Sequence, residues 1–248
     1  MNDMREATDH KDNWLLGALK PDDFAALESH LKCVDLSAGQ VLYETGEVVR
    51  DAYFPHDAMI SLMTVLEDGG TVEMCVFGRE GVTGFIGTLA TREALGRYIV
   101  QLPGRASRIP IGPLRDAFGT RPGIRQLFLS YTEALLAQTF QIVACNAVHG
   151  VEARCCRWIL TTHDRVGQDD LCLTHEFLAA MLGVQRPTVS LVTRTLQIAG
   201  LIAQRRGGIT VVDRAGLEEA ACECYGKIRR CFERHLPGTF RPADTPPK

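Results

Sequence analysis

The sequence lacks the features that would place it in a membrane or send it out of the cell. No apolar run approaches the ~20 residues that a membrane-spanning helix needs. The first thirty residues are rich in acidic side chains, from Asp3 to Asp23, whereas a secretion signal begins with basic residues. We therefore expect a soluble cytoplasmic protein that does not bind a membrane.

Metal-binding and redox motifs are also scarce, although the chain has nine cysteines. No C-x-x-C pair occurs, and no Cys/His group has the spacing of a zinc finger. The nearest approach to a metal set is Cys222-x-Cys224 together with Cys231. Because a free cysteine packs as a small hydrophobic side chain, we interpret all nine as buried structural thiols and predict no metal and no cofactor. Redox activity of one of them stays an open alternative.

Charge of one sign is not in large excess either, since the net charge is only −3. The charge is unevenly divided, however. Residues 1–151 hold 13 basic and 19 acidic side chains, whereas residues 152–248 hold 14 and 11. A surface that binds nucleic acid is therefore expected in the C-terminal part, where its affinity would depend on a few well-placed cations.

The most informative segment is 173–212, where two helical patterns flank the turn at residues 183–185. A basic hairpin, Arg205-Arg206-Gly207-Gly208, follows the second pattern. In that pattern Arg186, Ser190 and Arg194 recur at steps of four, so they share one polar face. Two short helices joined by a tight turn and followed by a hairpin are typical of a winged helix-turn-helix, whose second helix reads the DNA major groove. An ordinary helical hairpin with a solvated face is the alternative.

Residues 34–111 have a different texture, in which short strand-like runs are separated by glycines. Closely spaced runs of this kind predict an antiparallel roll or barrel. Short helices are predicted before the roll, in residues 14–32, and Pro21 starts the second of them. Examples of the strand-like runs are 41–43, 58–66, 71–77 and 98–102.

A long helix is predicted from residue 122 to 148, followed by helices over 152–164 and 214–235. Along the long helix, side chains recur at alternating steps of three and four, as in a coiled-coil seam with one polar member. We predict that this seam pairs two copies of the chain, and a helix that packs on its own domain is the alternative. The seam residues are Phe128, Tyr131, Leu135, Gln138, Ile142 and Cys145.

A β-roll, a long connecting helix and a winged helix-turn-helix, in this order, resemble the Crp/Fnr superfamily of bacterial transcription regulators over residues 15–235. The N-terminal markers are 38–47, which is similar to the opening of a cyclic-nucleotide-binding roll, and Tyr53-Phe54-Pro55. The block 78–104 is similar to a divergent branch of the superfamily. The stronger marker is 173–190, from Leu173-Thr174-His175-Glu176 to Arg186-Pro187-Thr188-Val189-Ser190.

The resemblance implies a set of DNA-contacting residues. Arg186 falls where family members place an arginine that grips guanine O6 and N7. Pro187 stands where an acidic residue is common, and Leu191, which suits a thymine methyl, replaces a second arginine, so the operator should differ from the best-known half-sites. Thr174 caps the first helix and either contacts a phosphate or serves as a plain cap. The set is Thr174, Arg186, Thr188, Ser190 and Leu191, with Arg194, Arg205 and Arg206 expected on phosphates.

The sensor half departs from the family pattern. Members that bind cyclic AMP need a Glu for the ribose and an Arg-Ser or Arg-Thr pair for the phosphate. Here Phe85 stands near the place of that Glu, and Arg97-Tyr98 is nearest to the pair. We therefore expect no cyclic AMP and keep Phe85, Arg97 and Tyr98 as candidates for another effector. The iron–sulfur branch uses N-terminal cysteines, and the first 32 residues contain none, so we expect no such cluster.

The expected fold class is α+β, in four parts: a β-roll in 1–120, a dimerisation helix in 121–149, a winged helix-turn-helix in 150–235 and a disordered tail in 236–248. We expect a homodimeric, non-enzymatic regulator that binds an inverted repeat in double-stranded DNA, with an unknown signal at the roll and RNA polymerase as a candidate partner. A ligand or redox sensor that acts through protein partners is the alternative. A metal-dependent β-barrel enzyme is weaker, because His56 is the only histidine between 34 and 111. The effector, the target genes and the sign of regulation stay open.

Overall fold

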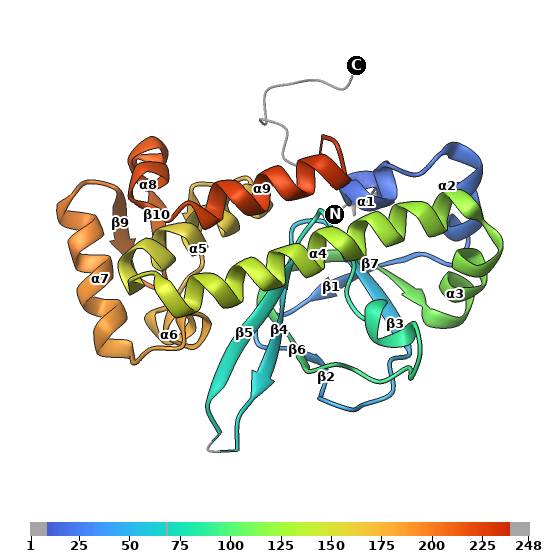
Figure 1. The fold of residues 1–248 in the computed structure, drawn as a ribbon, viewed down its shortest axis with the longest axis horizontal. Coiled ribbons are helices and arrows are strands. Elements are labelled where there is room, and N and C mark those ends of the chain that lie inside the picture. The colour runs from blue at the N-terminus through green and yellow to red at the C-terminus, as the bar shows by residue number, and fades with distance from the viewer. Residues whose placement is uncertain (1–8, 68, 239–248) are drawn as a thin grey trace, which may run out of the picture. The chain divides into compact units, whose positions relative to one another are not determined.

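The computed structural model describes residues 9–67 and 69–238 (Figure 1). They divide into two units, one lying within residues 1–60 and 77–132 and the other within 61–76 and 133–248. Most of the expected disordered tail, from residue 239 onward, lies outside the described residues, whereas Leu236 is buried. The expected domain boundaries at residues 120 and 149 stay predictions. No helix of the described part is both long and apolar enough to cross a bilayer.

Helices and strands follow one another as in a β-roll that leads through helices into a winged helix-turn-helix (Figure 1). The first part contains η1 (His10–Asp12), α1 (Trp14–Gly17), α2 (Pro21–Glu28), β1 (Lys32–Leu36), β2 (Val41–Tyr43), β3 (Asp51–Pro55), β4 (Met59–Val65), β5 (Thr71–Phe77), η2 (Ile86–Thr88), β6 (Arg97–Leu102), β7 (Gly104–Pro110) and α3 (Ile111–Thr120). The second part contains α4 (Pro122–Val148), α5 (Val151–Val166), β8 (Asp170–Leu171), α6 (His175–Leu182), α7 (Arg186–Ile198), β9 (Ile202–Arg205), β10 (Gly208–Val211), α8 (Arg214–Ala220) and α9 (Cys224–His235).

Two antiparallel sheets make the β-roll. One has the strand order β1-β7-β3, with Lys32 opposite Arg108 and Asp51 opposite Pro110, and the other has the order β2-β6-β4-β5. The four predicted strands are confirmed as β2, β4, β5 and β6. β1, β3 and β7 were not among the named examples, and β7 shows why. Its sequence, GRASRIP, lacks a run of large apolar residues, yet its backbone pairs with strands on both sides.

The core of the first unit includes a cluster of aromatic rings around Phe128 of α4. The ring of Phe128 meets Phe54 edge-on at 6.2 Å between centroids and Phe85 at 4.7 Å. One turn further along α4, the Tyr131 hydroxyl lies 3.2 Å from both the backbone N–H and the carbonyl oxygen of Val82. The beginning of α4 is thus packed on the roll that precedes it in the chain.

The second unit contains a buried carboxylate at Glu73 on β5. Its two oxygens accept hydrogen bonds from Trp158 Nε1 of α5 at 3.0 Å and from Ser61 Oγ of β4 at 2.6 Å. Burial raises the pKa of Glu73 above its ordinary value of 4.5, although the two hydrogen bonds act in the opposite direction. The carboxyl group therefore retains a proton to higher pH than it would in water.

Candidate nucleic-acid interface

The predicted helix-turn-helix is confirmed as α6 and α7. Thr174 caps α6, because its side chain accepts a hydrogen bond from the Phe177 N–H at 3.2 Å. Gly183 ends α6 in the left-handed conformation, with φ of 62°, a region that favours glycine. After Gln185, α7 begins with Arg186 and Pro187, where a proline costs no internal hydrogen bond. Local sequence alone therefore builds the tight turn.

The second helix of this pair has one buried and one exposed face. Val189, Val192 and Leu196 are buried and hold α7 against its own unit. The side chains predicted to contact DNA lie on the rest of the helix surface. Arg186, Leu191 and Arg194 are exposed, and Leu191 retains 67% of its accessible surface. Thr188 and Ser190 are half-buried.

Two of these side chains already have partners on α6. Arg186 Nε pairs with the Glu176 carboxylate at 2.9 Å, and both side chains are 64% exposed. Ser190 Oγ lies 3.0 Å from Nδ1 of His175. An exposed ion pair contributes only about 0–1 kcal/mol, so Arg186 can exchange Glu176 for another acceptor at little cost. The Ser190 hydroxyl thus joins the two helices in this conformation, and a base contact by Ser190 stays a prediction.

The wing is a short antiparallel hairpin that follows α7. β9 and β10 pair with Gly208 opposite Arg205, and β8 lies on the other side of β10. Gly207 turns the hairpin with φ of 81°. Arg205 Nε lies 3.4 Å from Asp170, and Arg206 is exposed at the tip. The hairpin thus presents two cations on the same unit as α7, as the sequence predicted for this segment.

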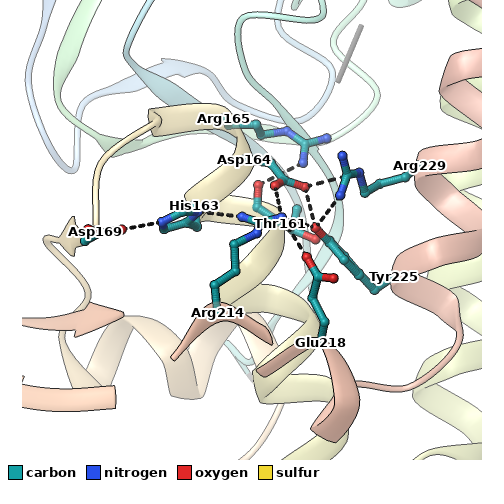
Figure 2. Close-up of polar contacts among 9 residues, drawn as sticks. All are labelled: Thr161, His163, Asp164, Arg165, Asp169, Arg214, Glu218, Tyr225 and Arg229. Atoms are coloured by element: carbon teal, nitrogen blue, oxygen red, sulfur yellow. Dashed lines mark hydrogen bonds and ion pairs between the residues drawn. The ribbon is translucent and has the colours of Figure 1, made fainter. Parts of the chain in front are cut away.

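A polar network fastens α5 to the elements around the wing (Figure 2). Arg214, the first residue of α8, donates to Asp164 at 2.7 Å and to the Tyr225 hydroxyl at 2.7 Å. Tyr225 in turn donates to Asp164 at 2.9 Å, and burial together with the Asp164 charge raises the pKa of the phenol. His163 lies between Arg214, at 2.6 Å, and Asp169, at 2.8 Å (Figure 2). These contacts fix the loop before β8, and so the base of the wing.

The three candidate effector residues lie in separate groups of contacts. Phe85 is buried, with its ring against Phe128 and 5.2 Å from the ring of Phe118. The Tyr98 ring lies 5.8 Å from Phe77 and 6.3 Å from Tyr43. Arg97 Nε instead pairs with Glu44 at 2.9 Å. Phe85 and Tyr98 therefore act as core residues of the roll in the described conformation, and an effector role for the three stays a prediction.

The residues of the predicted dimer seam on α4 are covered by other parts of the same chain. All six of its residues are buried within the chain itself, which is the alternative interpretation of their spacing. Gln138 shows why: it donates to the Val76 carbonyl at 3.3 Å and accepts a hydrogen bond from Arg165 at 3.1 Å. A spacing of three and four identifies a buried helix face but not the surface that covers it. The buried residues are Phe128, Tyr131, Leu135, Gln138, Ile142 and Cys145.

A second apolar stripe on α4 faces away from the chain. Leu129, Leu136 and Val143 recur at steps of seven, and Phe140 lies between the last two. All four are exposed, Phe140 to 68%. Four large apolar side chains in one stripe are an unusual surface for a helix with no partner. Sequence reasoning missed this stripe because the other face of α4 has the same period and more aromatic residues.

The cysteines also differ from expectation. Cys33 and Cys172 are exposed, so not all nine are buried structural thiols. Cys231 is half-buried and does not join Cys222 and Cys224 as the motif suggested. Cys145 and His149 gather around those two instead. Spacing along the chain therefore missed a Cys/His group that the fold brings together.

Comparisons with known proteins agree with this arrangement. Residues 153–220 match the family of Crp-like helix-turn-helix domains. A Crp/Fnr-family transcriptional regulator of Thermus thermophilus is 23% identical, with a TM-score of 0.62 over 77% of this chain and 98% of its own. The c-di-GMP-responsive regulator CLP of Xanthomonas campestris is 16% identical, with a TM-score of 0.61 over 77% and 99%. For FixK2 of Bradyrhizobium japonicum the values are 14%, 0.63, 77% and 98%. No curated protein matches the sequence.

Proposed function

We propose that this chain, which carries a Crp-like helix-turn-helix domain on the fold of the Crp/Fnr regulators, is a transcription regulator that binds specific sequences of double-stranded DNA. Its main support is the outward face of α7, where two arginines and a leucine are exposed beside a basic wing. A surface of this kind complements the major groove and its flanking phosphates. The protein then acts by binding and not by catalysis.

Sequence readout would depend on the first half of α7. The Arg186 guanidinium can donate to guanine O6 and N7 once it leaves Glu176, and the exposed Leu191 can contact a thymine methyl. Pro187 has no acceptor for a cytosine amino group. Thr188 and Ser190 lie on the flanks of the same helix. The preferred half-site would therefore combine a guanine with a neighbouring thymine.

The part of the DNA affinity that does not depend on base sequence would come from the remaining cations. Arg194, one turn beyond Ser190, and Arg206, at the wing tip, are both exposed and can reach phosphates. Arg205 would have to exchange Asp170 for a phosphate. Thr174 is exposed at the start of α6, but its hydroxyl already serves as the cap. Such contacts make binding sensitive to salt.

We further propose that the protein is a homodimer joined along the exposed stripe of α4, which contains Leu129, Leu136, Phe140 and Val143. Pairing of two stripes would cover apolar surface that the single chain leaves in water. A two-fold pair would present two copies of α7 to an inverted repeat, with half-sites about 34–36 Å apart. The stripe belongs to the same helix that the sequence predicted for dimerisation, on its opposite side.

Regulation would lie in the balance between two arrangements of such a dimer. A signal at the β-roll shifts this balance only if it binds one arrangement more tightly than the other. Phe85, Arg97 and Tyr98 remain the candidate contacts for that signal, and RNA polymerase is the candidate partner at a promoter. Neither cyclic AMP nor an iron–sulfur cluster is required for this scheme.

The direct test is selection of bound duplexes from a random pool by the purified full-length protein at low salt. We expect an enriched inverted repeat, and we expect Arg186→Ala to lose discrimination at one base pair of each half-site, by about 1–3 kcal/mol. Arg50→Ala, which removes an exposed arginine of the roll, is the matched control and should leave the enriched sequence unchanged. Failure to enrich any sequence, or an unchanged motif with Arg186→Ala, would overturn the proposal.

A further inference from the structure

Four metal-ligating side chains meet at the end of α4. Cys145 lies in the last turn of α4, and His149 directly follows that helix. Cys222 lies between α8 and α9, and Cys224 is the first residue of α9. Their sulfur and nitrogen atoms all lie within 4.8 Å of one another. Segments more than seventy residues apart in sequence thus converge on one point.

The spacing of these atoms matches the edges of a small tetrahedron. Cys145 Sγ lies 3.5 Å from Cys222 Sγ, and Cys224 Sγ lies 3.5 Å from Nδ1 of His149. A tetrahedral Zn²⁺ with Zn–S bonds of about 2.3 Å and a Zn–N bond of about 2.0–2.1 Å separates its ligand atoms by ~3.5–3.8 Å. These two distances agree with this range, and the more widely separated ligand atoms, all within 4.8 Å, need to approach by about an ångström.

The cluster is a poor fit to the other uses of buried thiols. Cys145, Cys222 and Cys224 form their own buried group, and the partly buried Ala153 packs against it. A disulfide would need a sulfur–sulfur distance near ~2.05 Å and would use only two of the four side chains. A thiol that merely fills space does not require a histidine nitrogen at hydrogen-bond distance from it.

The surrounding groups are those that support a metal centre. Glu223 lies 3.1 Å from Nε2 of His149, so the carboxylate can hold the imidazole with Nδ1 turned toward Cys224. Gln141 Nε2 donates to Cys224 Sγ at 3.0 Å.

We propose that Cys145, His149, Cys222 and Cys224 form a structural Zn²⁺ site of the Cys₃His type. All four positions of a tetrahedral ion are then taken by protein, so the site is closed and has no place for a substrate. On binding, three Zn–S bonds and one Zn–N bond form, and the thiols that were protonated release their protons to solvent. The ion would tie the end of α4 to the junction of α8 and α9, and so brace the unit that carries α7.

The first experiment is metal analysis of the full-length protein purified without chelator. We expect one zinc ion per chain, and we expect the double variant Cys222→Ser, Cys224→Ser to lose it. Cys33→Ser and Cys172→Ser are matched controls, because both thiols are exposed and lie outside the cluster, and they should retain the metal. Protein without zinc, or zinc retained by the double variant, would overturn the proposal.

A second experiment does not depend on the folding of a variant. Wild-type protein is stripped with a chelator under reducing conditions and titrated with Co²⁺, whose visible bands are intense in a tetrahedral thiolate site and weak in an octahedral one. We expect intense bands that saturate at one equivalent, disappear when Zn²⁺ is added, and accompany a rise in the unfolding temperature. Weak bands, iron with inorganic sulfide in the native protein, or a Cys145–Cys222 disulfide found by mass spectrometry would each contradict a zinc site. All of these readouts are independent of DNA binding.

Discussion

Replacing Phe140 by alanine tests the proposal that the exposed stripe of α4 joins two copies of the chain. Phe140 is 68% exposed, and its three neighbours in the stripe are also exposed. In contrast, Phe128 and Tyr131 on the other face are buried against the roll. The substitution therefore removes surface that only a partner can cover, and it should leave the folded single chain almost undisturbed.

The size of the effect follows from the exposed area. An aromatic side chain can bury about 150–250 Å². At 68% exposure, roughly 140 Å² of Phe140 remains to be covered, which corresponds to ~3.5 kcal/mol at about 25 cal/mol per Å². Alanine retains part of that gain, so the loss is about 2 kcal/mol per copy and about 4 kcal/mol per dimer. The dimer dissociation constant should therefore rise by roughly 10³-fold.

Sedimentation velocity over a range of protein concentrations measures this constant. Val212→Ala is the matched control, because Val212 is 61% exposed but lies after β10, far from α4 in sequence, and it should not change the constant. Tyr131→Phe gives the opposite result, since it removes the hydroxyl bonded to Val82 and should lower unfolding stability by about 1–3 kcal/mol without weakening the dimer. A Phe140→Ala protein that dimerises as tightly as wild type would refute the assignment of the stripe.

Three further perturbations test other parts of the account. Arg206→Gln should weaken binding to all duplexes alike and lower the slope of log affinity against log salt concentration by about 1, as measured by fluorescence anisotropy. A change in sequence preference would contradict a phosphate contact by Arg206. Glu73→Gln should remove a pH dependence of stability, because the raised pKa of Glu73 makes the wild type lose stability as the pH rises above 4.5. Urea unfolding at several pH values should show that the unfolding free energies of the two proteins converge in acid. A difference in unfolding free energy that stays constant with pH would count against this. Gly183→Ala should cost about 1 kcal/mol of unfolding free energy, since the φ of Gly183 is 62°. Gly112→Ala in α3 should be neutral or stabilising. Equal changes in unfolding free energy for the two variants would show that alanine is not strained at position 183.

The helix-turn-helix and its wing could be predicted from sequence, because the residues that mark their helix ends and turns lie within the segment itself. Thr174, Gly183 and Pro187 each mark a helix end by their own chemistry, and the wing turn is marked by Gly207. Strands β2 and β5 were also predicted with their observed bounds, since glycine separates them from their neighbours. Where backbone geometry is set by residues a few positions apart, sequence patterns are sufficient.

The remaining features depend on contacts between distant segments. β7 is recognisable only from its partners β1 and β3, which lie far from it in the chain. The two faces of α4 have similar apolar periods, so only the packing of Gln138 and Tyr131 shows which one is covered. The Cys/His cluster was missed for the same reason, because spacing rules detect nearby ligands and Cys145 is 77 positions from Cys222.

Hydroxyl-radical footprinting of the selected duplex by the purified protein tests the central claim most directly. If two copies of α7 read an inverted repeat, wild type should protect two symmetric patches on one face of the DNA, with their centres about 34–36 Å apart. Protection should weaken at both patches with Arg186→Ala and persist with Arg50→Ala. A single patch, asymmetric protection, or no protection at low salt would contradict a dimeric DNA-binding regulator.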